Sequence, residues 1–145
     1  MDFETLVRTR RSVRGYKTDP VPKEIIQEII DVAKGAPSSM NTRPWNLYVV
    51  TGEPLDKIRQ GNTERMLAGV KPQRDFPTKE AYEGIHRERQ VEIAKQLFAA
   101  MGIARDDKEM RQDWVMRGFR QFDAPVCVIV TYDKELSSSD DTAFD

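Results

Sequence analysis

The sequence of 145 residues has the length of a single domain, so we expect one hydrophobic core and no separate second domain. Its 39% hydrophobic and 32% charged residues, with a formal net charge of -1, exclude a strongly basic nucleic-acid binder. The one cysteine excludes an internal disulfide, and no run approaches the roughly 20 apolar residues of a membrane span. We therefore expect a soluble, cytoplasmic protein without a metal site.

Two helices and a strand are predicted in the first third of the chain. Asp2 is a plausible N-cap, and apolar residues at helical spacing predict a short helix that runs into the Arg10 region. Pro22 suits the first turn of a second helix, which has an isoleucine-rich face and ends near Gly35. A polar loop is expected over 36–44, and residues 45–51 have the β-branched and aromatic bias of a strand.

The remaining elements are less regular. A weakly patterned helix is predicted over 55–69, then a break over 71–78, and then helices over about 79–101 and 107–117. Residues 126–130 are apolar without alternation, which predicts a central strand buried on both faces. Two strands are too few for a stable sheet, so we expect that the second half of the fold is missing.

The densest group of chemically active side chains lies in residues 8–14, Arg-Thr-Arg-Arg-Ser-Val-Arg. Arginine presents a planar fork of donors that binds phosphate oxygens bidentately, and a serine hydroxyl adds a neutral donor. The segment therefore suits a phosphate. A solvated charge run is the other interpretation, and composition alone favours it, because arginine near a helix C-terminus is also stabilised by the helix dipole.

The second group is the loop at 36–45, Ala-Pro-Ser-Ser-Met-Asn-Thr-Arg-Pro-Trp. Its small residues permit close approach of the backbone, and its serine and asparagine side chains offer donors and acceptors to the edge of a planar heterocycle. An ordinary helix-to-strand connection rich in turn-forming residues explains the same composition. Taken alone, the composition of this loop favours the ordinary connection.

Together the two segments resemble the nitroreductase family, in which an early Arg-Arg-Ser-x-Arg motif is followed, past one amphipathic helix, by Ala-Pro-Ser and then Asn-x-x-Pro-Trp. Both motifs stand in that order here, and the resemblance spans residues 1–132 except for the variable region 62–120. It implies an α+β fold, a nitroreductase-like sheet flanked by helices. It also implies an intertwined homodimer with flavin mononucleotide (FMN) in the interface, and a chain that is truncated at its C-terminus.

The resemblance further implies roles for single residues. The phosphate and ribityl chain of FMN would meet Arg10, Arg11 and Ser12. Arg14 would lie near the pyrimidine end of the isoalloxazine ring, where a positive group stabilises the negative charge that reduction builds. The residues along the ring, contributed by the other subunit, would be Pro37, Ser38, Ser39 and Asn41. No catalytic side chain is implied, because the chemistry belongs to the flavin.

The implied activity is a ping-pong reaction in which NAD(P)H reduces the flavin and leaves, and a nitroaromatic or quinone-like acceptor takes its place. Residues 62–120 would form a cover over this small aromatic acceptor. Two alternatives stay open, namely a specialised flavin reductase such as a dehalogenase, and a non-catalytic flavin-binding or interaction module. His86 is interpreted as a solvated residue and Cys127 as a core residue, so neither is assigned chemistry.

Overall fold

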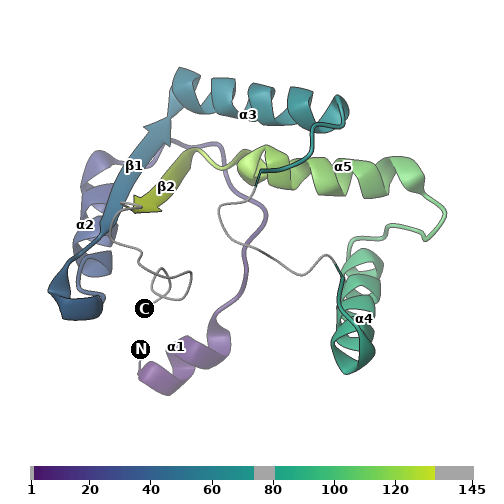
Figure 1. The fold of residues 1–145 in the computed structure, drawn as a ribbon, viewed down its shortest axis with the longest axis horizontal. Helices are drawn as coiled ribbons and strands as arrows, with labels where there is room; N and C mark the ends of the chain where they lie inside the picture. Colours follow the sequence, from purple (N-terminus) through teal and green to yellow (C-terminus); the bar gives the residue numbers. More distant parts are fainter. Residues whose placement is uncertain (1, 74–80, 133–145) are drawn as a thin grey trace.

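The computed structural model describes residues 2–73 and 81–132, and Figure 1 shows their arrangement. The chain begins with α1 (Phe3–Thr9), whose first turn is capped by the Asp2 carboxylate. An extended segment without helix or strand then leads to α2 (Lys23–Ala33). Both helices lie where the sequence predicted them, and Pro22 is the N-cap of α2.

A two-stranded antiparallel sheet joins the early and late parts of the chain. Strand β1 (Trp45–Thr51) pairs with β2 (Val126–Tyr132), so that Trp45 lies opposite Tyr132 and Thr51 lies opposite Val126. Both strands were predicted from the sequence. The prediction that the second one is central and buried on both faces is wrong for the described residues, because β2 pairs only with β1 and Val130 is 64% exposed. A strand whose apolar residues do not alternate with polar ones can be buried on both faces, but this pattern does not show whether other elements cover those faces.

Helix α3 (Gly52–Leu67) starts directly after β1, three residues before the predicted helix. Gly52 makes this abrupt turn with a positive φ of 55°, which glycine adopts without steric cost. Pro54 lies in the first turn of the helix, where its missing N–H is not needed. The next residue, Leu55, is the most buried side chain of the described chain.

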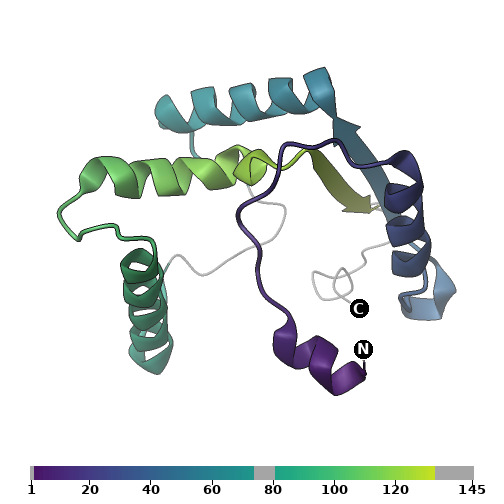
Figure 2. The ribbon, with the colours of Figure 1, turned by 180° about the vertical axis from the view of Figure 1, so that it is seen from behind.

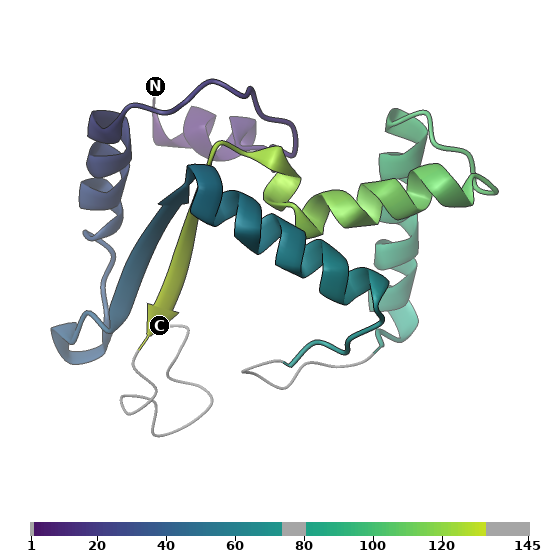
Figure 3. The ribbon, with the colours of Figure 1, turned by 90° about the horizontal axis from the view of Figure 1, so that it is seen from above.

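Two further helices lie beyond α3. Helix α4 (Gly84–Ala100) and helix α5 (Lys108–Phe119) are followed by a short 3-10 turn at Gln121–Asp123 that enters β2. Figure 1 and the view from behind in Figure 2 show α5 running beside α3, while α4 stands at the opposite end of the molecule from α2. In the view from above, α3 leads away from the end of the β1/β2 sheet (Figure 3). Helix α5 agrees with its predicted range within two residues, whereas α4 begins five residues after the start predicted for it.

A single arginine connects α3 to the end of α5. The side chain of Arg59 is 18% exposed, and its Nε donates to the carbonyl oxygen of Arg120 at 3.0 Å. Another guanidinium nitrogen donates to the carbonyl oxygen of Ala124, just before β2, and Nη1 pairs with Asp56 at 3.0 Å. Arg59 therefore fixes the approach to β2 against α3.

The buried core of the described chain is small. Its buried apolar residues are Leu55, Ile103, Met116 and Ala124, and most other apolar side chains are partly exposed. On α2, for example, Ile25 and Ile29 are 46% and 60% exposed, although they belong to the face that the sequence predicts to be buried. A large apolar surface thus lies open on the sheet and on α2.

Candidate functional site

The arginine segment begins at the C-terminal end of α1. Arg8 pairs with Glu4 at 2.8 Å on the surface of this helix. The Nη1 atom of Arg11 donates to the carbonyl oxygens of Arg8 and Arg10 at 2.8 and 2.9 Å. These carbonyls lie at the helix end, where acceptors lack helical donors, so the side chain of Arg11 caps α1.

Arg10, Ser12 and Arg14 differ from Arg11. Within the described residues, no hydrogen bond or ion pair engages their side chains, and all three are exposed. Alternate side chains of an extended segment project to the same side, so these three can face one ligand while Arg11 turns back to the helix. Two free guanidinium groups and a hydroxyl form a donor set that fits a phosphate and an adjacent polar edge.

Two hydrogen bonds hold the extended segment in place. The Nη2 atom of Arg117, on α5, donates to the carbonyl oxygen of Arg14 at 3.1 Å. The hydroxyl of Tyr16 donates to the carbonyl oxygen of Val13 at 3.1 Å. The backbone around Arg14 is therefore fixed while its guanidinium remains available. Arg117 had no signal in the sequence, because its partner lies 103 residues away.

The helix that carries the segment has a charged N-cap. The carboxylate of Asp2 accepts hydrogen bonds from the backbone N–H of Thr5 at 2.9 Å and from its hydroxyl at 2.8 Å. These bonds hold the pKa of Asp2 below its usual value. The ionised form of Asp2 therefore stabilises the first turn of α1, and with it the start of the arginine segment.

The loop between α2 and β1 folds into a left-handed turn. Met40, Asn41 and Arg43 have φ angles of 52°, 57° and 47°, a region that costs non-glycine residues roughly 1–2 kcal/mol each. The turn is held by its own polar groups. The backbone N–H of Arg43 donates to the hydroxyl oxygen of Ser38 at 2.9 Å, and the N–H of Asn41 donates to the Ser38 carbonyl oxygen at 2.9 Å.

Arg43 takes part in this turn, although sequence reasoning assigned it no role. Its Nε donates to the Oδ1 atom of Asn41 at 3.1 Å, which orients the asparagine amide. Strained non-glycine backbone of this kind concentrates at ligand sites, where the surrounding structure enforces it. The residue types in the motif indicated a turn, but nothing in them predicted its left-handed form.

The structure does not bring the two segments together within one chain. No hydrogen bond or ion pair among the described residues links 10–14 to 37–41. Figures 1 and 2 both show α1 apart from the loop that follows α2. The placement of Arg10, Arg11, Ser12, Arg14, Pro37, Ser38, Ser39 and Asn41 around one ligand therefore remains a prediction that requires two chains.

Other chemistry is not concentrated in the described part of the chain. His86 is exposed on α4, and Cys127 is half-buried in β2. Residues 2–73 and 81–132 contain no group of three or more histidine, cysteine or acidic side chains arranged to hold a metal ion. Over the same residues, no helix has both the length and the apolar character needed to cross a membrane.

Comparison with known proteins decides the family. A model described as the Nitroreductase family matches residues 7–145. The chain belongs to the nitroreductase family. This confirms the resemblance that the arginine and Ala-Pro-Ser motifs carried.

Relatives in the nitroreductase family cover most of this chain. The nitrobenzene nitroreductase of Ectopseudomonas oleovorans is 40% identical over 137 residues, which make up 92% of this chain and 60% of the relative. The chloronitrobenzene nitroreductase of Comamonas testosteroni is 38% identical over 137 residues, which again make up 92% of this chain and 60% of the relative. The chain thus spans about 60% of the length of these two relatives.

A solved nitroreductase confirms the fold. The crystal structure of the FMN-dependent nitroreductase NfnB from Mycobacterium smegmatis in complex with NADPH matches with a TM-score of 0.81 and 30% identity. The match covers 94% of this chain and 62% of that one. The nitroreductase-like α+β fold expected from the sequence is therefore confirmed over the residues that this chain contributes.

Proposed function

We propose that this nitroreductase-family protein is an FMN-dependent oxidoreductase that passes electrons from NAD(P)H to nitroaromatic or quinone-like acceptors. The proposal rests on the conformation of the two motifs and on the side-chain donors that they leave available. Within the described residues, the arginine segment presents two unpaired guanidinium groups on a fixed backbone, and the Ala-Pro-Ser loop is held in a strained left-handed turn. Bound FMN would supply the hydride and electron chemistry, and the chain would supply binding, orientation and charge.

The phosphate end of the flavin is assigned to Arg10 and Ser12. Their side chains are exposed and without a partner in the described chain, which suits donors for a phosphate. Arg11 is assigned to the same end of the flavin. Its guanidinium caps α1, so it supports the phosphate site indirectly. Arg14 is assigned to the pyrimidine edge of the ring, where its fixed backbone would hold a positive charge close to the charge that reduction develops.

The ring contacts are assigned to Pro37, Ser38, Ser39 and Asn41 of a second copy of the chain. Two observations support a homodimer. The two motifs stay apart within one chain, and the apolar face of α2 that leads into the loop is open to solvent at Ile25 and Ile29. An open apolar surface of this kind is typical of an interface. Sedimentation analysis tests this directly, since a monomer at micromolar concentration would contradict the dimeric site.

The first experiment is the visible absorption spectrum of the purified protein. Denaturation then releases any flavin for identification and for measurement of its ratio to protein. Near-stoichiometric FMN that NADH or NADPH bleaches supports the proposal. A colourless protein that takes up no added FMN contradicts it, and bound FMN that neither nucleotide reduces favours the non-catalytic flavin-binding module instead.

A further inference from the structure

One hydrogen bond joins the arginine segment, residues 8–14, to α5, although the two are far apart in the sequence. The Nη2 atom of Arg117 donates to the carbonyl oxygen of Arg14 at 3.1 Å, across 103 residues. Among residues 2–73 and 81–132, no other hydrogen bond or ion pair joins residues 10–17 to an element beyond α1. This bond is therefore the polar contact that fixes the backbone at Arg14 against the rest of the chain.

The end of α5 that carries Arg117 is itself anchored. Arg117 is half-buried, and its guanidinium lies 5.2 Å from the ring centroid of Trp114, one turn earlier on the same helix. Three residues later, the carbonyl oxygen of Arg120 accepts a hydrogen bond from Arg59 of α3 at 3.0 Å. Helices α3 and α5 also run side by side (Figures 1 and 2). Arg117 therefore reaches Arg14 from a helix end that is tied to the framework.

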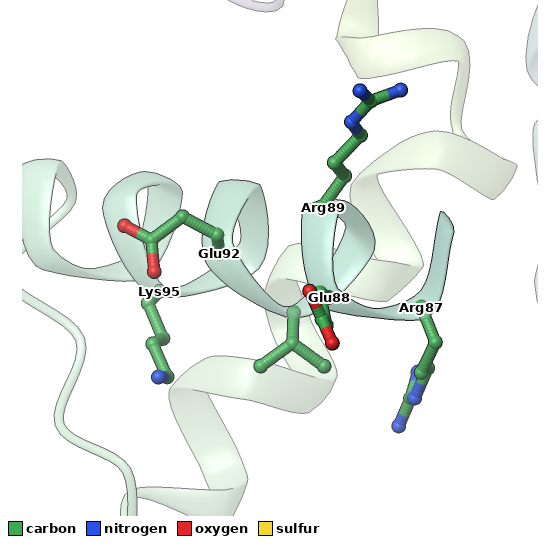
Figure 4. A pocket seen from close by; sticks show the side chains of 6 residues that line it. Arg87, Glu88, Arg89, Glu92 and Lys95 are labelled. Carbon is green, nitrogen blue, oxygen red and sulfur yellow. The ribbon is translucent and has the colours of Figure 1, made fainter. Parts of the chain in front are cut away.

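The other arginines of α4 and α5 do not reach the arginine segment. Figure 4 shows the side chain of Arg89 projecting to the opposite side of α4 from that of Arg87. On α5, the guanidinium of Arg111 lies 4.0 Å from the centroid of an aromatic ring of α4. Within the described residues, no hydrogen bond joins these three arginines to the arginine segment. Arg111 therefore matches Arg117 in helix, charge and aromatic contact, and differs from it in the bond to Arg14.

We infer that Arg117 is a positioning residue for Arg14 and thereby sets the reduction potential of bound FMN. The inference rests on the proposed function, which assigns Arg14 to the pyrimidine edge of the flavin. The side chain of Arg14 is exposed and no described residue engages it, so its direction depends on the backbone that carries it. A charge stabilises the reduced ring best when it is held in place before reduction, because a mobile arginine loses side-chain freedom when it settles against the ring.

The first test needs no flavin. NMR relaxation of the purified chain measures the order parameters of the backbone amides of residues 13–16. We expect values near about 0.85, typical of rigid backbone, to fall to about 0.6 or lower in Arg117→Ala and to stay high in the control Arg111→Ala. Unchanged order in Arg117→Ala, or an equal loss in both variants, overturns the inference whether or not the chain binds FMN.

The second test is the midpoint potential of bound FMN, measured by dye-coupled titration. We expect Arg117→Ala to weaken the binding of reduced relative to oxidised FMN by about tenfold, which lowers a two-electron potential by about 30 mV. In an Arg14→Ala background, the same substitution should change that ratio by less than about twofold, because the group that Arg117 positions is gone. Arg117→Lys should keep most of the potential, since lysine retains a donor for the carbonyl oxygen.

The double substitution separates positioning from a direct effect of charge. A through-space effect of the Arg117 charge on the flavin would persist in the Arg14→Ala background, and that result overturns the inference. A lower potential in Arg14→Ala without a lower potential in Arg117→Ala also overturns it, while the proposed function stands. An unchanged potential in Arg14→Ala, or a chain that takes up no FMN, contradicts the proposed function, and this inference with it.

Discussion

Within the arginine motif, Arg11 differs from Arg10 and Ser12 in how its side chain is used. Arg11 caps the preceding helix, while no described residue engages the side-chain donors of Arg10 and Ser12. We predict that Arg10→Ala and Ser12→Ala each weaken FMN binding, by about tenfold or more for the charged contact. Quenching of flavin fluorescence measures the affinity. Arg8→Ala is the control, because Arg8 already pairs with Glu4, and an effect as large as that of Arg10→Ala would contradict the phosphate assignment.

Arg14 is expected to act on the flavin's potential more than on its binding. A hydrogen bond to a charged group contributes about 1.5–3 kcal/mol, which for a two-electron couple corresponds to about 30–60 mV. Arg14→Ala should therefore lower the midpoint potential of bound FMN by that amount, as measured by dye-coupled titration, while Arg14→Lys should retain most of it. An unchanged potential in Arg14→Ala would remove the role assigned to this residue.

At the scale of elements, the stability of α1 should depend on pH through Asp2. The pKa of Asp2 is lowered in the folded chain by hydrogen bonds from Thr5. The ionised carboxylate therefore stabilises α1 at pH values above its unfolded pKa, and this contribution is lost as the pH falls through the lower, folded pKa. NMR chemical shifts of residues 3–9 should report fraying of α1 in strong acid. Asp2→Ala should show the same fraying at neutral pH. If neither acid nor this substitution changes the chemical shifts of α1, the N-cap role of Asp2 is contradicted.

The elements show which part of the fold the sequence predicts. Local sequence signals located every α-helix and both strands of the described chain, but not the two short 3-10 turns. The pairing of Thr51 with Val126 and the bond from Arg117 to Arg14 were not predicted, since they join residues far apart in sequence. Likewise, the residue types predicted a polar loop over 36–44, but its left-handed turn depends on hydrogen bonds such as that of Arg43 to Ser38, which single-residue preferences do not encode.

At the scale of the whole molecule, we expect the substitution of Arg59 to affect the largest part of the structure. Its guanidinium bonds two backbone carbonyls at the approach to β2. Arg59→Ala would leave those part-buried acceptors without partners, so we predict a loss of about 1–3 kcal/mol in the free energy of unfolding, measured by urea titration. Lys57→Ala, which removes an exposed pair with Glu53 on the same helix, should cost less than about 1 kcal/mol. Equal losses would show that Arg59 is not a structural link.

The pairing of Thr51 with Val126 has a consequence for how this fold can diversify. The chain leaves the sheet and returns to it at neighbouring positions, after the excursion that carries α4 and α5. Lengthening such an excursion costs only about 0.6 kcal/mol for each doubling of its length. Insertions and deletions among these helices can therefore change the length of the segment between the strands while the strand register stays fixed. Under the proposed function, such changes would alter which acceptor is admitted without rebuilding the sheet.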